Sequence, residues 1–132
     1  MSVTTSIISA ALTDLLFDRS IDVETAVARH FADDYRQRTD GVWADRAEFV
    51  EHITHLRGVV ESGSVEVHDE LSDGDRYADR HTVHARKNDG SEVAFEVLVF
   101  AEMTADGRFR QIIETTTMLS GGQEDRNLGS AR

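Results

Sequence analysis

The segment with the clearest structural signal is SEVAFEVLVFAEMT, residues 91–104. Its side chains alternate between two faces, as they do along a β-strand. One face carries Val93, Phe95, Val97, Val99, Ala101 and Met103, and the other carries Ala94, Glu96, Leu98, Phe100 and Glu102. Because the first face is apolar throughout, we expect it to lie on the core.

Similar runs rich in Val, Thr, Ile and Phe stand on both sides of this strand, at residues 64–71, 75–86 and 107–118. Three Asp-Gly pairs separate the runs, namely Asp73-Gly74, Asp89-Gly90 and Asp106-Gly107. Such pairs favour the positive φ angles of tight hairpins. The pattern therefore predicts an antiparallel meander of four strands.

Upstream of the meander the apolar residues recur at helical spacing, which predicts three helices, at residues 6–18, 22–32 and 45–62. The third helix is the best marked, because Asp45 and Glu48 resemble a capping box. Residues 35–39 alternate and predict a short extended segment before Asp40-Gly41. Helices followed by strands indicate an α+β fold in which the helices cover one face of the sheet.

Composition limits the class of protein. A chain of 132 residues fits one domain. Its 25 acidic against 14 basic residues give a net charge of -11, which repels nucleic acid. The absence of cysteine excludes disulfides and thiolate chemistry.

The two ends of the chain predict neither an anchor nor a leader peptide. Asp14 interrupts the N-terminal apolar run, which also lacks a basic region, so we expect a cytoplasmic protein that does not bind membranes. Residues 120–132 begin with Gly121-Gly122 and offer almost nothing to bury, so they predict a disordered tail after a single domain at 1–119.

Four stretches resemble the nuclear-transport-factor-2-like superfamily, in its SnoaL-like, polyketide cyclase-like branch: residues 15–22, 31–35, 74–78 and 106–109. The resemblance covers about residues 6–119. It implies a cone-shaped α+β fold, in which three N-terminal helices pack on a strongly curved, mainly antiparallel sheet around a pocket. It also implies homodimers through the outer sheet face. Because relatives include cyclases, isomerases, dehydratases, epoxide hydrolases, binders and adaptors, it implies no single activity.

Three ionisable residues are the candidates for catalysis. Asp79 and His81 share a strand face that the resemblance turns toward the cone, and a carboxylate beside an imidazole prepares a general base. Glu114 lies where similar epoxide hydrolases place a catalytic carboxylate, and burial would raise its pKa. The alternatives are that Asp79 and His81 lie solvated at the rim, and that Glu114 is a structural carboxylate.

The sequence departs from two enzyme patterns of the superfamily. Val83 stands where the epoxide hydrolases have a second carboxylate, and His81 stands where they have an arginine. Thr39 occupies the place of the ketosteroid isomerase base, and Val99 that of its carboxylic acid. We therefore expect neither mechanism in its full form.

A pocket for a small hydrophobic or aromatic molecule is predicted from aromatic residues and their neighbours, namely Tyr35, Thr39, Trp43, Tyr77, Phe95, Val97 and Val99. Trp43 is expected to cap its mouth. Core packing is the alternative explanation for the aromatic residues. His52 and His55 lie three apart, but Ile53 and Leu56 define the buried side of their helix, so we predict that both histidines lie at its edge and bind no metal.

The predicted dimer face lies on the back of the sheet, with Arg80, Thr82, His84, Leu98 and Phe100. A solvated sheet surface is the alternative. The sequence thus predicts a small-molecule-binding protein that works without a cofactor, as an isomerase, cyclase or dehydratase acting by proton transfer. A non-catalytic ligand carrier or protein adaptor of the same fold is the second hypothesis.

Overall fold

The computed structural model describes residues 6–128. The helices are α1 (Ile7–Leu12), α2 (Val23–His30) and α3 (Arg46–Val59). Thr13–Phe17 continue α1 as a π-helical turn, closed by the bond from Asp18 N–H to the Thr13 carbonyl. The three predicted helices are therefore confirmed.

Side-chain caps fix where the helices begin. The Asp22 carboxylate accepts a hydrogen bond from the Thr25 N–H at 2.7 Å. At α3, Asp45 accepts from the Glu48 N–H while Glu48 accepts from the Asp45 N–H, which confirms the capping box. α3 ends at Val59, earlier than predicted, because Val60 is already extended.

The strands are β1 (Phe31–Thr39), β2 (Val42–Asp45), β3 (Val60–Asp73), β4 (Arg76–Lys87), β5 (Glu92–Met103) and β6 (Phe109–Ser120). The glycines of the three Asp-Gly pairs have φ between +62° and +87°, as tight hairpins require. The last four strands form the predicted antiparallel meander.

The sheet is larger than the predicted meander, because β1 and β2 extend it to six strands in the order β2-β1-β6-β5-β4-β3. The predicted segment 35–39 is the end of β1, which pairs with β6 in parallel and with β2 as a hairpin. The pairing with β6 joins residues about 75 apart in sequence, which local periodicity does not reveal.

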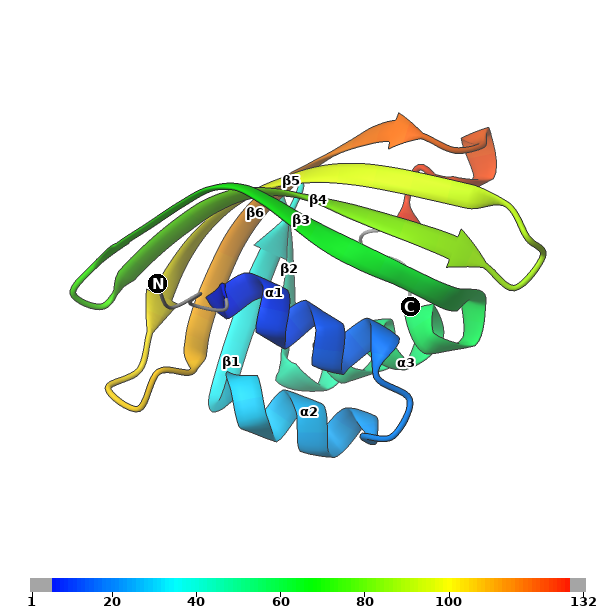
Figure 1. Cartoon of the computed structure of the whole chain (residues 1–132). Coiled ribbons are helices and arrows are strands. Elements are labelled where there is room, and N and C mark those ends of the chain that lie inside the picture. The colour runs from blue at the N-terminus through cyan, green and yellow to red at the C-terminus, as the bar shows by residue number, and fades with distance from the viewer. Residues whose placement is uncertain (1–5, 129–132) are drawn as a thin grey trace, which may run out of the picture.

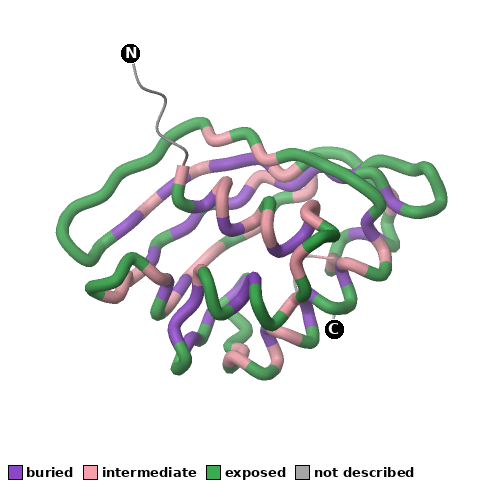
Figure 2. Tube along the Cα trace, turned by 60° about the horizontal axis from the view of Figure 1, so that its bottom comes forward, coloured by how far each residue is buried: buried purple, intermediate pink, exposed green. Residues whose placement is uncertain are grey.

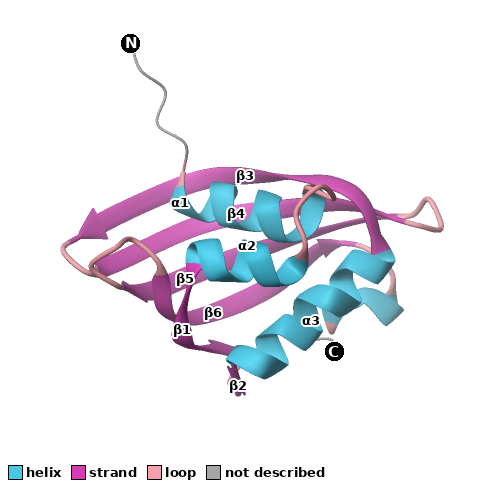
Figure 3. Cartoon of the chain, turned by 90° about the horizontal axis from the view of Figure 1, so that it is seen from below, coloured by secondary structure: helices cyan, strands magenta, loops and turns pink. Residues whose placement is uncertain are grey.

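The sheet curves over the helices, and α1, α2 and α3 lie across its concave face (Figures 1 and 3). This is the expected α+β cone fold. Buried residues gather between the two layers (Figure 2). Aromatic rings form the centre of this core. The centroid of the Phe31 ring lies 4.7 to 5.4 Å from those of Tyr35, Phe49 and Phe109. No helix within residues 6–128 is long and apolar enough to cross a membrane.

The segment after β6 was predicted to be a disordered tail, but it is folded as far as residue 128. Gln123–Asp125 form a 3-10 turn, and the Asp125 carboxylate binds the Lys87 ammonium at 2.7 Å. A buried ion pair thus holds a segment that has few apolar side chains to bury. The rest of the predicted tail, residues 129–132, lies outside the described residues.

Candidate functional site

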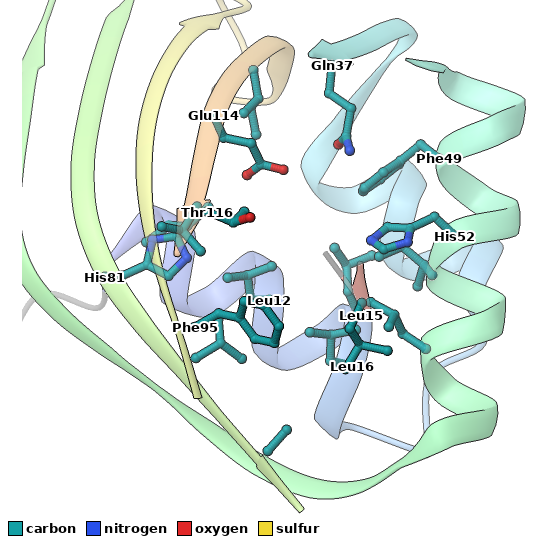
Figure 4. Close-up of a pocket in the computed structure, with 18 of the residues that line it drawn as sticks. Leu12, Leu15, Leu16, Gln37, Phe49, His52, His81, Phe95, Glu114 and Thr116 are labelled. Carbon is teal, nitrogen blue, oxygen red and sulfur yellow. The ribbon is translucent and has the colours of Figure 1, made fainter. Parts of the chain in front are cut away.

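A cavity of about 130 Å³ lies between the concave face of the sheet and the helices (Figure 4). Most of its wall is apolar, with side chains from the first helix and its π-turn, α3 and the sheet. The polar side chains in the wall are Gln37, His52, His81, Glu114 and Thr116. The cavity thus combines an apolar body with a few polar groups, which is typical of small-molecule sites.

Asp79 and His81 form a buried pair on β4. His81 Nδ1 lies 2.5 Å from Asp79 Oδ1, and their side chains are 2% and 0% exposed. His81 lines the cavity, whereas Asp79 stands behind it. An ionised carboxylate can only accept, so Nδ1 donates to Asp79 and Nε2 is the ring nitrogen that Asp79 leaves free. The alternative of a solvated rim is therefore wrong for this pair.

Glu114, the other ionisable residue predicted at the site, stands at the end of a chain of hydrogen bonds. The Tyr35 hydroxyl donates to Gln37 Oε1 at 2.7 Å, and Gln37 Nε2 donates to Thr39 Oγ1 at 3.1 Å. The Thr39 hydroxyl then donates to Glu114 Oε1 at 2.8 Å. Burial raises the pKa of the Glu114 carboxyl, and the Thr39 hydroxyl and the His81 imidazole offset only part of the rise.

The register of the sheet places the two centres on one wall. Asp79 pairs with Val99, which pairs with Glu114, so one strand separates the two carboxylates. Two strand spacings put their Cα atoms about 10 Å apart. In Figure 4 the Glu114 carboxyl and the His81 ring are seen on the same side of the cavity, facing His52 on α3. A ligand in the cavity can therefore contact both groups.

Residues 17–112 match the family model of the SnoaL-like domain. The chain belongs to the SnoaL-like family. A relative of this SnoaL-like protein, an uncharacterised protein of Schizosaccharomyces pombe, is 33% identical over 115 residues, which make up 87% of each chain.

Solved structures share the fold of this SnoaL-like protein. The candidate hydroxylase AclR from Streptomyces galilaeus has a TM-score of 0.68 and 16% identity, covering 95% of this chain and 83% of its own. The candidate polyketide cyclase IdmH from Streptomyces antibioticus has a TM-score of 0.65 and 16% identity, covering 83% and 88%. A protein of unknown function from Exiguobacterium has a TM-score of 0.65 and 15% identity, covering 85% and 98%.

The predicted binding residues of this SnoaL-like protein divide into two groups. Tyr35, Phe95 and Val97 line the cavity. The other four do not: Thr39, Tyr77 and Val99 are buried beside it, and Trp43 is 46% exposed. The Tyr77 hydroxyl donates to Glu70 instead, at 2.5 Å.

Trp43 does not cap the mouth of the cavity. It lies on β2, where the Arg36 guanidinium stacks on its ring at 4.6 Å from the centroid. The residue belongs to a strand at the edge of the sheet.

Three polar residues of the wall were not predicted as site residues. His52 was expected at the edge of its helix, but it is buried and faces the cavity. The signal for it is the spacing of Phe49, His52, Ile53 and Leu56, which is that of one helix face. Gln37 follows Tyr35 by two residues on β1, and Thr116 follows Glu114 by two residues on β6. Each therefore lies on the same strand face as a predicted site residue. Within residues 6–128 no three His, Asp or Glu side chains gather as a metal site.

Proposed function

We propose that the protein binds a small, mainly apolar molecule in the cavity and transfers a proton within it. One observation carries the proposal: two groups able to exchange protons, His81 and Glu114, line a cavity whose wall is mostly apolar. In such a site the apolar wall binds the body of a ligand, and the few polar groups orient its reacting part.

The two groups suit opposite tasks. His81 has its acceptor nitrogen free of Asp79 and can remove a proton from the ligand. Glu114 has a raised pKa, so it holds a proton at higher pH than an ordinary glutamate and can donate it. Removal of a proton at one atom and its return at another is the chemistry of isomerisation, cyclisation and dehydration, and it uses no cofactor.

The relatives are consistent with this class of reaction. IdmH is a candidate polyketide cyclase, and a structural neighbour from Agrobacterium tumefaciens is a candidate isomerase of the SnoaL-like family. Their identities to this chain, 16% and 13%, carry the fold alone. The activity therefore depends on the site residues and needs a direct test.

Deuterium exchange into acetophenone, a ketone with one ring, tests the proton transfer. In D₂O the wild type should accelerate the loss of the methyl proton signal in the NMR spectrum. Without the base, His81→Gln should lower the enzymatic rate about a hundredfold or more. His84→Gln is the matched control, since His84 lies on the same strand but on the outer face, and it should keep the wild-type rate.

The second hypothesis, a non-catalytic carrier, makes the opposite prediction. The mostly apolar wall suits a carrier equally well. If acetophenone shifts the NMR signals of cavity residues but its methyl protons exchange no faster than in buffer, proton transfer is wrong and the carrier is favoured. An unchanged exchange rate in His81→Gln would likewise remove His81 as the base.

We also propose that a second copy of the chain covers the outer face of the sheet. Leu98 and Phe100 are 48% and 54% exposed there, although they belong to a central strand. Phe100 pairs with Ala78 on one side and Ile113 on the other, so an apolar row crosses three strands. Exposed apolar patches of this kind are typical of protein interfaces.

A further inference from the structure

The segment that follows β6 turns back under the end of the sheet, on the side of the helices (Figure 1). Gly121 has a φ of +141°, which favours glycine and reverses the chain. The Gly122 N–H then donates to Asp125 Oδ2 at 2.9 Å, which closes the 3-10 turn Gln123–Asp125. The backbone of this segment is thus folded by its own residues.

One ion pair fastens the segment to the sheet. Lys87, the only lysine of the chain, ends β4, and its Nζ lies 2.7 Å from Asp125 Oδ1. The two side chains are only 11% and 6% exposed. Removing one partner of a buried pair leaves the other without compensation, so the two residues hold each other in place.

Three residues beyond Asp125, the Leu128 side chain forms part of the cavity wall. It also packs on the hydrophobic core. The cavity that it helps to line has about 130 Å³. An apolar cavity of about 150 Å³ holds benzene, and drug-sized ligands need about 300 Å³ or more. The space inside the cavity therefore fits about one ring.

We propose that Leu128 is a specificity-determining residue that limits ligands to the size of a single ring, and that Lys87 and Asp125 are the positioning residues that hold it there. The proposal rests on the proposed function only in taking the cavity as the ligand site. Fused-ring ligands such as steroids are then excluded by the wall and not by the polar groups.

Phenol and 2-naphthol, with one and two rings, are the probes for this limit. Dissociation constants come from NMR titrations of the full chain. The wild type should bind phenol more tightly than 2-naphthol, although 2-naphthol is the more hydrophobic. Leu128→Ala should change the ratio of the two dissociation constants by about tenfold or more in favour of 2-naphthol. A few methyl-sized groups in a pocket are enough to discriminate between two ligands by that factor. Leu128→Phe should shift it the other way and weaken phenol binding.

The ion pair is tested with a conservative and a disruptive variant. Lys87→Met should shift the ratio toward 2-naphthol, as Leu128→Ala does, whereas Lys87→Arg keeps the charge and should keep the wild-type ratio. Leu119→Ala is the matched control, since Leu119 is 56% exposed at the end of β6, and the ratio should not change.

Three results would overturn the proposal. They are an unchanged ratio in both Leu128 variants, an equal shift in Leu119→Ala, and the absence of binding of either probe to the wild type and to Leu128→Ala. These results are independent of the proton transfer, because binding ratios need no turnover. A protein that selects by size but exchanges no protons is a carrier with this size limit.

Discussion

Glu114 carries a partly buried carboxyl, and desolvation raises its pKa above the ordinary value. Between the ordinary and the raised pKa the folded state binds a proton that the unfolded state has lost, so stability falls as the pH rises through this window. Glu114→Gln keeps the shape and the bond from Thr39 but cannot ionise. It should therefore melt a few degrees higher than the wild type at pH 8, since about 1 kcal/mol moves the midpoint of a domain of this size by roughly 4 °C.

The same variant at acid pH provides the internal check. Below the ordinary pKa of glutamate both states are protonated, so the gain over the wild type should vanish near pH 4. Glu61→Gln, which removes a charge from an exposed position on β3, controls for the net charge of -11. A gain that is equal at both pH values, or equal in Glu61→Gln, would show that burial of the carboxyl is not the cause.

How far the sequence predicts individual site residues depends on the element that carries them. The period of a strand puts Asp79 and His81 on one face, and the resemblance to the family turns that face toward the cone. The buried face of α3 also includes His52, at helical spacing from Phe49 and Leu56, but spacing alone does not show that a polar side chain on that face lines a cavity. Trp43 could not be placed at all without the pairing of β1 and β2.

At the scale of elements, the packing of the π-turn after α1 on β3 depends on the absence of a side chain at Gly63. A Cβ built on Gly63 would lie 2.3 Å from the His84 carbonyl oxygen and 2.5 Å from the Phe17 ring. Gly63→Ala must push these groups apart, and overpacking of this kind costs about 1 to 3 kcal/mol. Urea unfolding followed by circular dichroism measures the loss.

Gly58→Ala is the matched substitution. Gly58 lies in the last turns of α3, and a Cβ there meets no atom within 4 Å. Alanine is favoured over glycine in a helix, so this variant should gain about 0.5 to 1 kcal/mol. Opposite signs for the two variants support the close approach at Gly63. A neutral Gly63→Ala would mean that both the Phe17 ring and the backbone at His84 move aside freely.

The elements were more predictable than their arrangement. Caps and Asp-Gly turns are local signals, and they placed the three helices and the meander. The parallel pairing of β1 with β6 and the ion pair between Lys87 and Asp125 join distant parts of the chain. Neither follows from periodicity, and the second one ordered a segment that composition alone would leave without structure.

At the scale of the whole molecule, the proposed dimer sets the exposed row on the back of the sheet against a net charge of -11 on each copy. Salt screens this repulsion, so the dimer should tighten when NaCl rises from about 0.05 to 0.5 M. Sedimentation equilibrium should then give twice the mass of 14.7 kDa.

Phe100→Glu should return the protein to a monomer, because it buries a like charge in the interface of both copies. Leu71→Glu, at a residue 74% exposed near the tip of the β3-β4 hairpin, adds the same charge away from the row and should leave the dimer intact. A monomer at every salt concentration, or equal dissociation by both variants, would assign the row to the solvated back of the sheet.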